Sequence, residues 1–152
     1  MKLTTRARYG IRLKLDIAEG GFEERPVRLS EDSERTGISR RYLDQVVMPL
    51  KGAGLLMGVK GRRGGYQLAR PADQIRLGDI VEATIGPVTL VDCVGTPGFC
   101  RRSAGCSCHL IYRLLSAGIR VALHDYTLAD LSNPARLEEI RGAVQRLEAQ
   151  LV

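Results

Sequence analysis

Residues 28–69 constrain the fold more than any other part of the chain, because they alternate helix signals, glycine turns and β-prone runs in a fixed order. Ser30, followed by two acidic residues, is predicted to cap a short helix that stops at Gly37. Ser39 then caps a second predicted helix over about 40–48, and the next proline either ends it or starts a new turn. Two short helices joined by a tight glycine turn are typical of a helix-turn-helix.

A basic hairpin is predicted directly after these helices. The runs 55–60 and 66–69 are β-prone, and the sequence GRRGG between them supplies the glycines that a turn with positive φ angles requires. The pattern predicts a mainly α fold, a winged helix-turn-helix DNA-binding domain with a two-stranded β wing. In such a domain the second helix enters the major groove, and the hairpin reaches a phosphate backbone or the minor groove.

Helices are also predicted on both sides of this unit. Apolar residues at steps of three and four run along a first helix that ends at Gly20–Gly21. This stripe consists of Leu3, Ala7, Ile11, Leu15 and Ala18. Another short helix, over 77–84, follows the hairpin and is expected to pack Ile80, Val81 and Thr84 into the core.

The C-terminal part has more apolar helix surface than one small domain needs. A long helix is predicted to begin at Ser107 or Cys108 with two apolar rows, and a last helix adds a third row. The rows are Leu110, Leu114, Ala117 and Val121; Ile111, Leu115, Gly118 and Ala122; and Leu137, Ile140, Val144, Leu147 and Leu151. We therefore expect a homodimer, with a DNA-binding domain at 1–86, a loop at 87–107 and a long C-terminal dimerisation helix within 108–152.

Basic charge is concentrated in the first half of the chain. Residues 1–76 carry 16 basic and 9 acidic side chains, whereas residues 77–152 carry 7 and 8. A one-sided basic domain is typical of a nucleic-acid binder, so double-stranded operator DNA is the expected partner. Arginines interrupt the N-terminal apolar residues and no segment is long enough to cross a bilayer, so we expect a cytoplasmic protein with no membrane partner.

All four cysteines lie within residues 93–108, in a stretch rich in glycine and proline that ends beside His109. Such a stretch is predicted to be a surface loop. Thiols stay reduced in the cytoplasm, which favours a metal or redox role over structural disulfides. Zinc is one alternative, although the long gaps are unlike the close cysteine pairs of most zinc sites. An iron–sulphur cluster is the other, because thiolates are soft donors that stabilise ferric iron and bridging sulphide.

Five segments resemble the IscR-type family of winged-helix iron–sulphur cluster transcription regulators. They are MKLTTRARYGIRLKLDIA, SERTGISRRYLDQV, LKGAGLL, VKGRRGGYQLAR and IRLGDIVEA, and the resemblance covers about residues 1–130. It implies a homodimer clasped by the long helix, with two DNA-binding units spaced for a pseudo-palindrome. Ser30 and Asp32 stand where relatives usually have Ala and Ile, which predicts a loosely packed helix there.

The resemblance also gives the cysteines a role. Cys93, Cys100, Cys106 and His109 are similar to the family's three cysteines and one histidine that hold a [2Fe-2S] cluster, with one extra residue in the first gap. Imidazole in place of one thiolate raises the reduction potential and makes ligation weaker and pH-sensitive, which suits a sensor. Cys108 is an alternative fourth ligand and would favour an all-thiolate [2Fe-2S] or a [4Fe-4S] cluster.

The candidate DNA-binding residues lie at the start of the first helix, at the start of the recognition helix and around the hairpin turn. They are Thr5, Arg6, Ser39, Arg40, Arg41, Tyr42, Asp44, Gln45, Lys60, Arg62 and Arg63. Arginine can pair with guanine, glutamine with adenine, and tyrosine can reach a phosphate. Asp44 repels phosphate but accepts a hydrogen bond from cytosine, so it selects sequence. Relatives carry the longer Glu there; a surface ion pair with Arg40 or Arg41 is the alternative role.

Two other classes of function use some of the same residues. An iron–sulphur electron-transfer protein would need the cysteines but not the basic hairpin. A cluster-free regulator of the same fold, acting in redox sensing or cysteine metabolism, would respond through oxidation of Cys106 and Cys108. His124 is expected to be a packed or surface residue, and no set of catalytic groups predicts an enzyme. We therefore favour a transcription regulator that senses iron–sulphur status or oxidative or nitrosative stress.

Overall fold

The computed structural model describes residues 3–19 and 25–151. It is mainly helical with one antiparallel hairpin, which confirms the predicted winged helix-turn-helix fold with a long helix towards the C-terminus. The predicted end of the first helix at Gly20–Gly21 lies outside the described residues. The elements in chain order are α1 (Thr5–Glu19), α2 (Leu29–Thr36), α3 (Arg40–Gly52), β1 (Leu56–Val59), β2 (Gly65–Leu68), η1 (Ala72–Gln74), α4 (Leu77–Ile85), α5 (Asp92–Gly95), η2 (Ser103–Gly105), α6 (Ser107–His124), α7 (Leu128–Ser132) and α8 (Pro134–Ala149).

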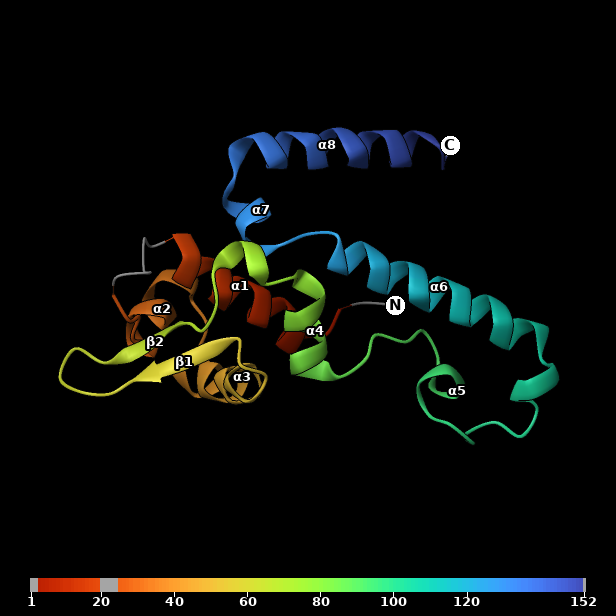
Figure 1. Cartoon of the computed structure of the whole chain (residues 1–152), viewed down its shortest axis with the longest axis horizontal. Coiled ribbons are helices and arrows are strands. Elements are labelled where there is room, and N and C mark those ends of the chain that lie inside the picture. The colour runs from red at the N-terminus through yellow and green to blue at the C-terminus, as the bar shows by residue number, and fades with distance from the viewer. Residues whose placement is uncertain (1–2, 20–24, 152) are drawn as a thin grey trace.

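The first four helices and the hairpin pack around one core and form the left half of the molecule in Figure 1. We call this part, α1 to α4 with the hairpin, the N-terminal body. β1 and β2 pair in antiparallel register, and a bridge from Val27 to Tyr66 ties the segment before α2 to the hairpin. The most deeply buried side chains include Leu13, Ile17, Leu43, Val46, Leu50, Ile75 and Ile80. This core holds the two short helices and the hairpin in one fixed unit.

Two helix boundaries differ from the sequence prediction. α2 begins at Leu29 with Arg28 at its N-cap, and Ser30 is an exposed residue of the first turn instead of the cap. The helix starts earlier because Leu29 is a buried core residue. α3 does not end before Pro49 but continues to Gly52. The proline is tolerated because Leu50, the next residue, is fully buried and holds the last turn against the core.

The predicted stripe lies at the edge of the buried face of α1, with Ile11, Leu15 and Ala18 only partly buried against the core. Only Ala7 of that stripe is buried, and Leu3 is 48% exposed. The buried residues are Ala7, Gly10, Leu13, Lys14 and Ile17. The face is set by close contact with α4, because a Cβ atom added at Gly10 would lie only 2.9 Å from Cγ2 of Thr84. Periodicity of large apolar residues misses a face that is built on a glycine and a lysine.

Asp32 of α2 points into the core, at a position where the resemblance implies an apolar residue in relatives. Its side chain is fully buried, and neither carboxylate oxygen has a hydrogen-bond partner within the described residues. The carboxylate of Asp16 on α1 lies nearby and is held by the Arg35 guanidinium at 2.5 Å. Burial, and then the adjacent Asp16 carboxyl through side-chain contact and through its negative charge, raise the pKa of Asp32 to about 7, despite the opposing charges of Arg35 and Arg12. The looseness predicted for this helix stays a prediction.

Lys14 is the other buried ionisable side chain of the core. Its Nζ donates a hydrogen bond of 2.7 Å to the carbonyl oxygen of Leu55, which also accepts one from the backbone N–H of Ala69 at 3.1 Å. Burial, and then the charge of Arg70, lower the pKa of Lys14 to about 7, although Asp79 acts in the opposite direction. The folded protein therefore carries fewer protons on this group than the unfolded chain between about pH 7 and 10.5.

Replacing Lys14 with Met is expected to stabilise the protein at and below pH 7, by on the order of 2 kcal/mol. Methionine fills a similar volume without a charge, and the Leu55 carbonyl keeps its bond to Ala69. The gain should shrink as pH rises from about 7 towards 10.5, where the lysine is neutral in both states. Urea unfolding at several pH values measures this, and a variant that is less stable than wild type at pH 6 would contradict it.

α6 extends away from the N-terminal body, and almost all of its surface is exposed. It runs from the cysteine loop, at the far right of Figure 1, back towards α4. Ser116 is its only buried residue among those described, whereas Leu110, Leu114 and Val121 are 60–68% exposed. Such a continuous exposed apolar surface is unusual for a monomer.

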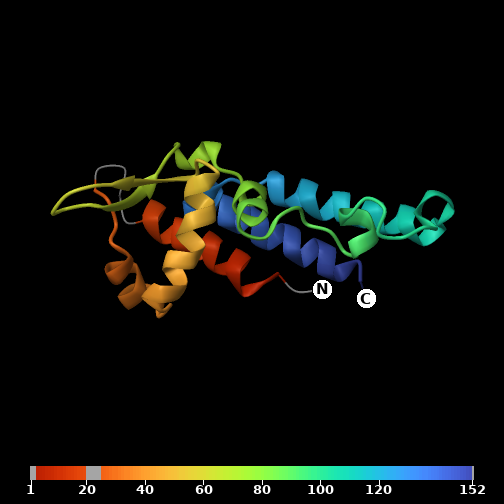
Figure 2. The same ribbon diagram turned by 90° about the horizontal axis from the view of Figure 1, so that it is seen from below.

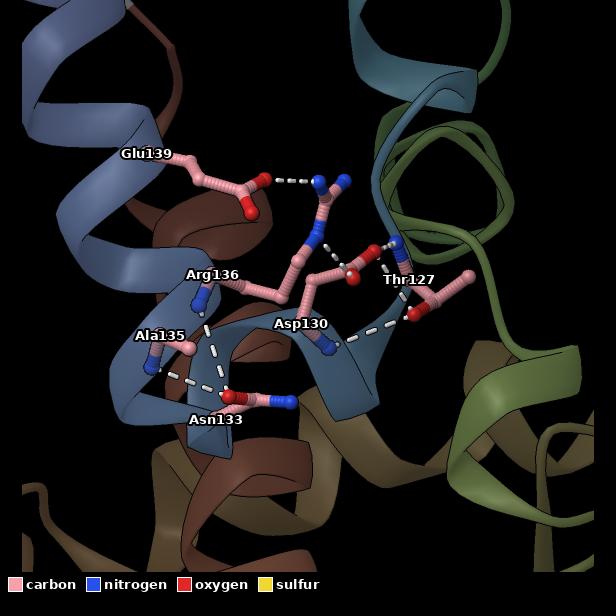
Figure 3. Close-up of polar contacts among 6 residues, drawn as sticks. All are labelled: Thr127, Asp130, Asn133, Ala135, Arg136 and Glu139. Atoms are coloured by element: carbon pink, nitrogen blue, oxygen red, sulfur yellow. Dashed lines mark hydrogen bonds and ion pairs between the residues drawn. The ribbon is translucent and has the colours of Figure 1, made fainter.

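α8 is held in place by a polar junction with α7, shown in Figure 3. Thr127 and Asp130 form a capping box at α7, and the Asn133 side chain caps α8 by accepting hydrogen bonds from the next turn. Arg136 bridges Asp130, at 3.0 Å, and Glu139. α8 consequently runs in the opposite direction from α6, as Figures 1 and 2 both show, with Leu147 exposed. No helix in the described ranges is long and apolar enough to cross a membrane.

Candidate nucleic-acid interface and cysteine loop

The start of α3 presents predicted DNA-binding side chains to solvent. Gly37 has a φ of +71° and ends α2 in the left-handed conformation, so that the chain turns sharply into α3. One face of α3 is then fixed in the core by Leu43, Val46 and Val47. The other face and the preceding residue are exposed: Ser39, Arg40, Arg41, Asp44 and Gln45. A rigid helix with donors and acceptors on its first two turns can read base edges in a major groove.

Tyr42 differs from its neighbours on α3. It is half-buried, and its ring packs edge-on against Tyr9 of α1, with the ring centroids 5.5 Å apart and the planes at 87°. The contact fixes the angle between α1 and α3. Asp44 forms no ion pair with Arg40 or Arg41 within the described ranges, which weakens the alternative that it is merely paired surface charge.

The hairpin turn carries the second group of predicted residues. Lys60, Arg62 and Arg63 are all exposed at its tip, next to Gly61 with a φ of +111°. Arg28, at the N-cap of α2, donates a hydrogen bond of 2.5 Å from Nη2 to the carbonyl oxygen of Arg62. The sequence prediction missed Arg28, because the contact spans 34 residues and no local pattern signals it.

A groove connects the recognition helix to the wing. An open hollow of about 260 Å³ lies between them, lined by Arg28, Leu29, Ser30, Arg40, Asp44, Gly64, Gly65 and Tyr66. A neighbouring hollow of about 230 Å³ is lined by Arg25, Pro26, Arg28, Glu31 and Arg63. Thr5 and Arg6 are exposed at the start of α1, which also belongs to the N-terminal body. The surface therefore combines guanidinium groups from three elements, an arrangement that suits a phosphate backbone.

The cysteine loop lies at the other end of the molecule, beyond the N-terminus of α6 (Figure 2). None of the four cysteines is in a disulfide. Cys93 is the second residue of the one-turn helix α5, and it is half-buried, as are Cys100 and Cys106. Cys108 is exposed on the first turn of α6. The loop thus has three partly covered thiols and one open thiol.

Part of the predicted ligand set shares one hollow. Cys106 and His109 both line an open hollow of about 410 Å³ at the start of α6, and Cys93, Cys100 and Cys108 do not. Across the described residues, no three His, Cys, Asp or Glu side chains are already gathered as a metal site. The loop would therefore have to bring Cys93 and Cys100 towards this hollow before all four ligands could share one group.

The donor chemistry nonetheless fits an iron–sulphur cluster. Nδ1 of His109 is buried and has no hydrogen-bond partner within the described residues. A buried polar nitrogen without a partner costs free energy, unless it binds a ligand that is not part of the polypeptide. Reduced thiolates with one imidazole are suitable ligands for ferric iron.

The chain is similar to transcription regulators in sequence. A family model described as Rrf2, iron-dependent transcriptional regulator, matches residues 3–134. Protein rrf2 of Nitratidesulfovibrio vulgaris is 40% identical over 137 residues, which cover 90% of this chain and 91% of that protein. The HTH-type transcriptional regulator IscR of Enterobacter sp. (strain 638) is 35% identical over 150 residues, which cover 99% of this chain and 91% of that protein.

Solved structures of regulators share the fold. T. potens IscR superposes with a TM-score of 0.71 at 30% identity, covering 89% of this chain and 88% of that one. CymR, described as the global cysteine regulator of B. subtilis, has a TM-score of 0.69 at 28% identity, covering 86% of this chain and 95% of that one. These similarities confirm the predicted class, a transcription regulator and not an enzyme.

Proposed function

Because the chain belongs to the Rrf2 family of transcriptional regulators, we propose that it is a homodimer whose operator affinity or site choice is controlled by an iron–sulphur cluster. The observation that carries the proposal is the presence, in one chain, of an exposed basic helix-turn-helix surface and a loop of free cysteines beside an unpartnered histidine nitrogen. IscR-named relatives support this combination.

The DNA surface we propose consists of α3, the wing and the start of α1. Arg40, Arg41 and Gln45 would contact base edges, and Asp44 would select cytosine. The wing side chains Lys60, Arg62 and Arg63 would bind phosphates or the minor groove, and Thr5, Arg6, Ser39 and Tyr42 would add backbone contacts. Arg28 joins the set because its hydrogen bond to the Arg62 carbonyl fixes the wing tip relative to α2.

The ligands we propose are Cys93, Cys100, Cys106 and His109, with a [2Fe-2S] cluster favoured. The shared hollow of Cys106 and His109 supports His109 over Cys108 as the fourth ligand. When bound, the cluster supplies a redox-active centre that is lost or altered under iron limitation, oxidants or nitric oxide. The chain's part is to present three thiolates and the Nδ1 or Nε2 lone pair of His109 from one loop, which orders that loop against α6.

The dimer we propose forms through the exposed apolar rows of α6 and α8. An isologous two-fold contact places one N-terminal body on each half-site of a palindrome and doubles the DNA contacts. The apolar surface is sufficient for this role, because Leu110, Leu114 and Leu147 are each more than 60% exposed in one protomer.

Replacing single cysteines tests the cluster and its ligands. Wild-type protein purified without oxygen is expected to be red-brown and to contain iron and acid-labile sulphide. Cys93→Ala, Cys100→Ala and Cys106→Ala should each lose most of the iron and sulphide, because a cluster left with three protein ligands dissociates readily. Cys108→Ala is the matched control and should keep them, whereas His109→Ala should lower cluster occupancy and change the EPR spectrum.

Two results would contradict this assignment in different ways. Loss of the cluster in Cys108→Ala with retention in His109→Ala would exchange the fourth ligand. A wild-type protein that stays free of iron after anaerobic reconstitution would refute the cluster itself, and a colourless, zinc-loaded protein would point to a zinc site.

A cluster-free thiol regulator is the second candidate function. It is favoured by the structural similarity to CymR, a cysteine regulator, and by the absence of a gathered metal site among the described residues. Oxidation would then act on Cys106 and the exposed Cys108. Mild peroxide treatment of protein that never held iron distinguishes the two candidates, because only this one expects such protein to change its DNA affinity reversibly. Mass spectrometry then identifies the oxidised cysteines.

A further inference from the structure

One face of α6 is polar along its whole length and is turned towards the rest of its own chain. It carries His109, Arg113, Ser116, Arg120 and His124, at steps of three and four. Over these residues the helix rises about 22 Å. One end of this face holds the proposed ligand His109, and the other end lies against α4. The face therefore spans the distance between the cysteine loop and the N-terminal body.

The α4 end of this face is held by several contacts. Arg120 Nε lies 2.7 Å from Oε1 of Glu82, and Arg76 Nη1 donates to the carbonyl oxygen of His124 at 2.7 Å. The His124 ring also packs on Gly78 so closely that a Cβ there would come within 2.4 Å of it. α4 in turn packs against α1 and α3, the candidate recognition helix. A shift of α4 relative to α6 would therefore reach the DNA surface.

The middle of the face is held by one hydrogen bond. The backbone N–H of Leu90 donates to Oγ of Ser116 at 3.1 Å, and Ser116 is only 3% exposed. Leu90 belongs to the six-residue linker 86–91, which joins the end of α4 to α5. Cys93, the first proposed cluster ligand, follows Leu90 by three residues. The linker thus connects α4 at one end to a proposed ligand at the other, with Ser116 between them.

The packing around this hydrogen bond is open. A hollow of about 530 Å³ lies between α6 and the segment formed by the linker and α5, lined by residues of all three, including Thr89, Val94, Leu114 and Ser116 itself. Beside this hollow, the directed hydrogen bond to the buried Ser116 hydroxyl is a contact that holds the linker on α6 at a defined position.

We propose that Ser116 is a positioning residue that couples the cysteine loop to the N-terminal body within one protomer. Gathering Cys93 with the other ligands pulls on a linker that Ser116 holds on α6, so the displacement is passed to α4 and not absorbed in the loop. The inference rests on the proposed function, because it needs a cluster and a DNA site. It adds a route that runs through the protomer and is separate from the dimer contact.

The test compares DNA affinity with and without the cluster. The probe is the duplex of about two helical turns that the wild-type protein selects from a random pool. Dissociation constants are measured anaerobically for the loaded and the cluster-free form of each variant. Ser116→Ala should load as much iron as wild type but bring the ratio of the two constants roughly fivefold closer to one. Ser116→Thr, which keeps the hydroxyl, should retain the wild-type ratio.

Two further measurements separate coupling from simple loss of structure. Amide exchange at Leu90 should be faster in Ser116→Ala and unchanged in Ser132→Ala, an exposed serine on α7. Arg120→Gln removes the contact with Glu82 at the α4 end and should also reduce the ratio, which keeps the test valid if Ser116→Ala does not fold.

The outcomes distinguish this inference from the proposed function. Wild-type protein that never loads iron refutes the proposed function, and the coupling with it. Loaded wild type whose affinity does not depend on loading also refutes both. Loaded wild type with a cluster-dependent affinity, together with Ser116→Ala showing the same dependence, overturns the role of Ser116 alone.

Discussion

Replacing Leu115 with Glu is expected to convert the protein into monomers and to weaken its binding to a palindromic duplex by about a hundredfold or more. Leu115 is 49% exposed and lies on the row of α6 that is opposite the polar face of Ser116. In a two-fold contact, the two introduced carboxylates would be buried close to each other without partners. Each monomer would then bind one half-site only. Sedimentation velocity at micromolar concentration and fluorescence anisotropy with the selected duplex measure both effects.

A glutamate elsewhere controls for a general effect of charge. Ile85 at the end of α4 is 39% exposed and lies outside α6 and α8, so Ile85→Glu should remain dimeric. A Leu115→Glu protein that sediments as a dimer and binds the duplex with wild-type affinity would show that this row of α6 is not the contact between protomers.

Replacing Asp32 with Leu is expected to stabilise the protein at pH 8 by on the order of 3 kcal/mol, a rise in Tm of about 10 °C. Asp32 is fully buried without a hydrogen bond from the described residues, and its pKa is raised to about 7. The folded protein therefore holds more protons than the unfolded chain between about pH 4 and 7, and this group's contribution to stability falls as pH rises through that window. Leucine removes the cost of a charge beside Asp16.

The pH dependence identifies the cause of the effect. The difference in Tm between Asp32→Leu and wild type should be small at pH 4, grow to about pH 7 and then stay constant. Asp32→Asn, which keeps the shape but cannot ionise, should show the same pH profile with a smaller gain, because burying a polar amide still costs desolvation free energy. A difference that does not vary with pH would mean that the pKa of Asp32 is the same in the folded protein as in the unfolded chain, and would contradict this account.

The stability gain of Lys14→Met depends on pH in the opposite direction, because the lysine side chain is a buried base. Its gain is largest at low pH, whereas the gain of Asp32→Leu is largest at high pH. Together the two variants locate the two ionisable groups whose burial opposes folding in the N-terminal body.

The fold was largely predictable, because turns and hairpins leave local signals. Gly37 and the GRRGG turn set the order of helices and strands, and the structure has that order. Side-chain burial was less predictable, because it depends on which elements meet. α1 turns Gly10 and Lys14 inwards, since α4 approaches the glycine closely and the carbonyl of Leu55, directly before β1, accepts a hydrogen bond from the lysine. Neither fact is visible in the periodicity of α1.

The candidate site was predictable to a different degree in its two parts. Exposed arginines at the start of a helix and at a hairpin turn can be recognised from the sequence, and they lie on the surface as expected. Arg28 and Ser116 were missed, because each acts on a backbone group more than 25 residues away. The cysteine spacing predicts which donors are available, but it does not predict that only Cys106 and His109 share a hollow.

The central claim is that one chain passes the state of a cysteine-bound cluster to its DNA surface. The most direct test is the affinity of wild-type protein for the selected duplex, measured on one anaerobic preparation before and after the cluster is removed by a chelator. The dissociation constant is expected to change by at least about fivefold, in parallel with the loss of visible absorption and acid-labile sulphide. A dissociation constant that stays the same while the sulphide is lost would contradict the claim.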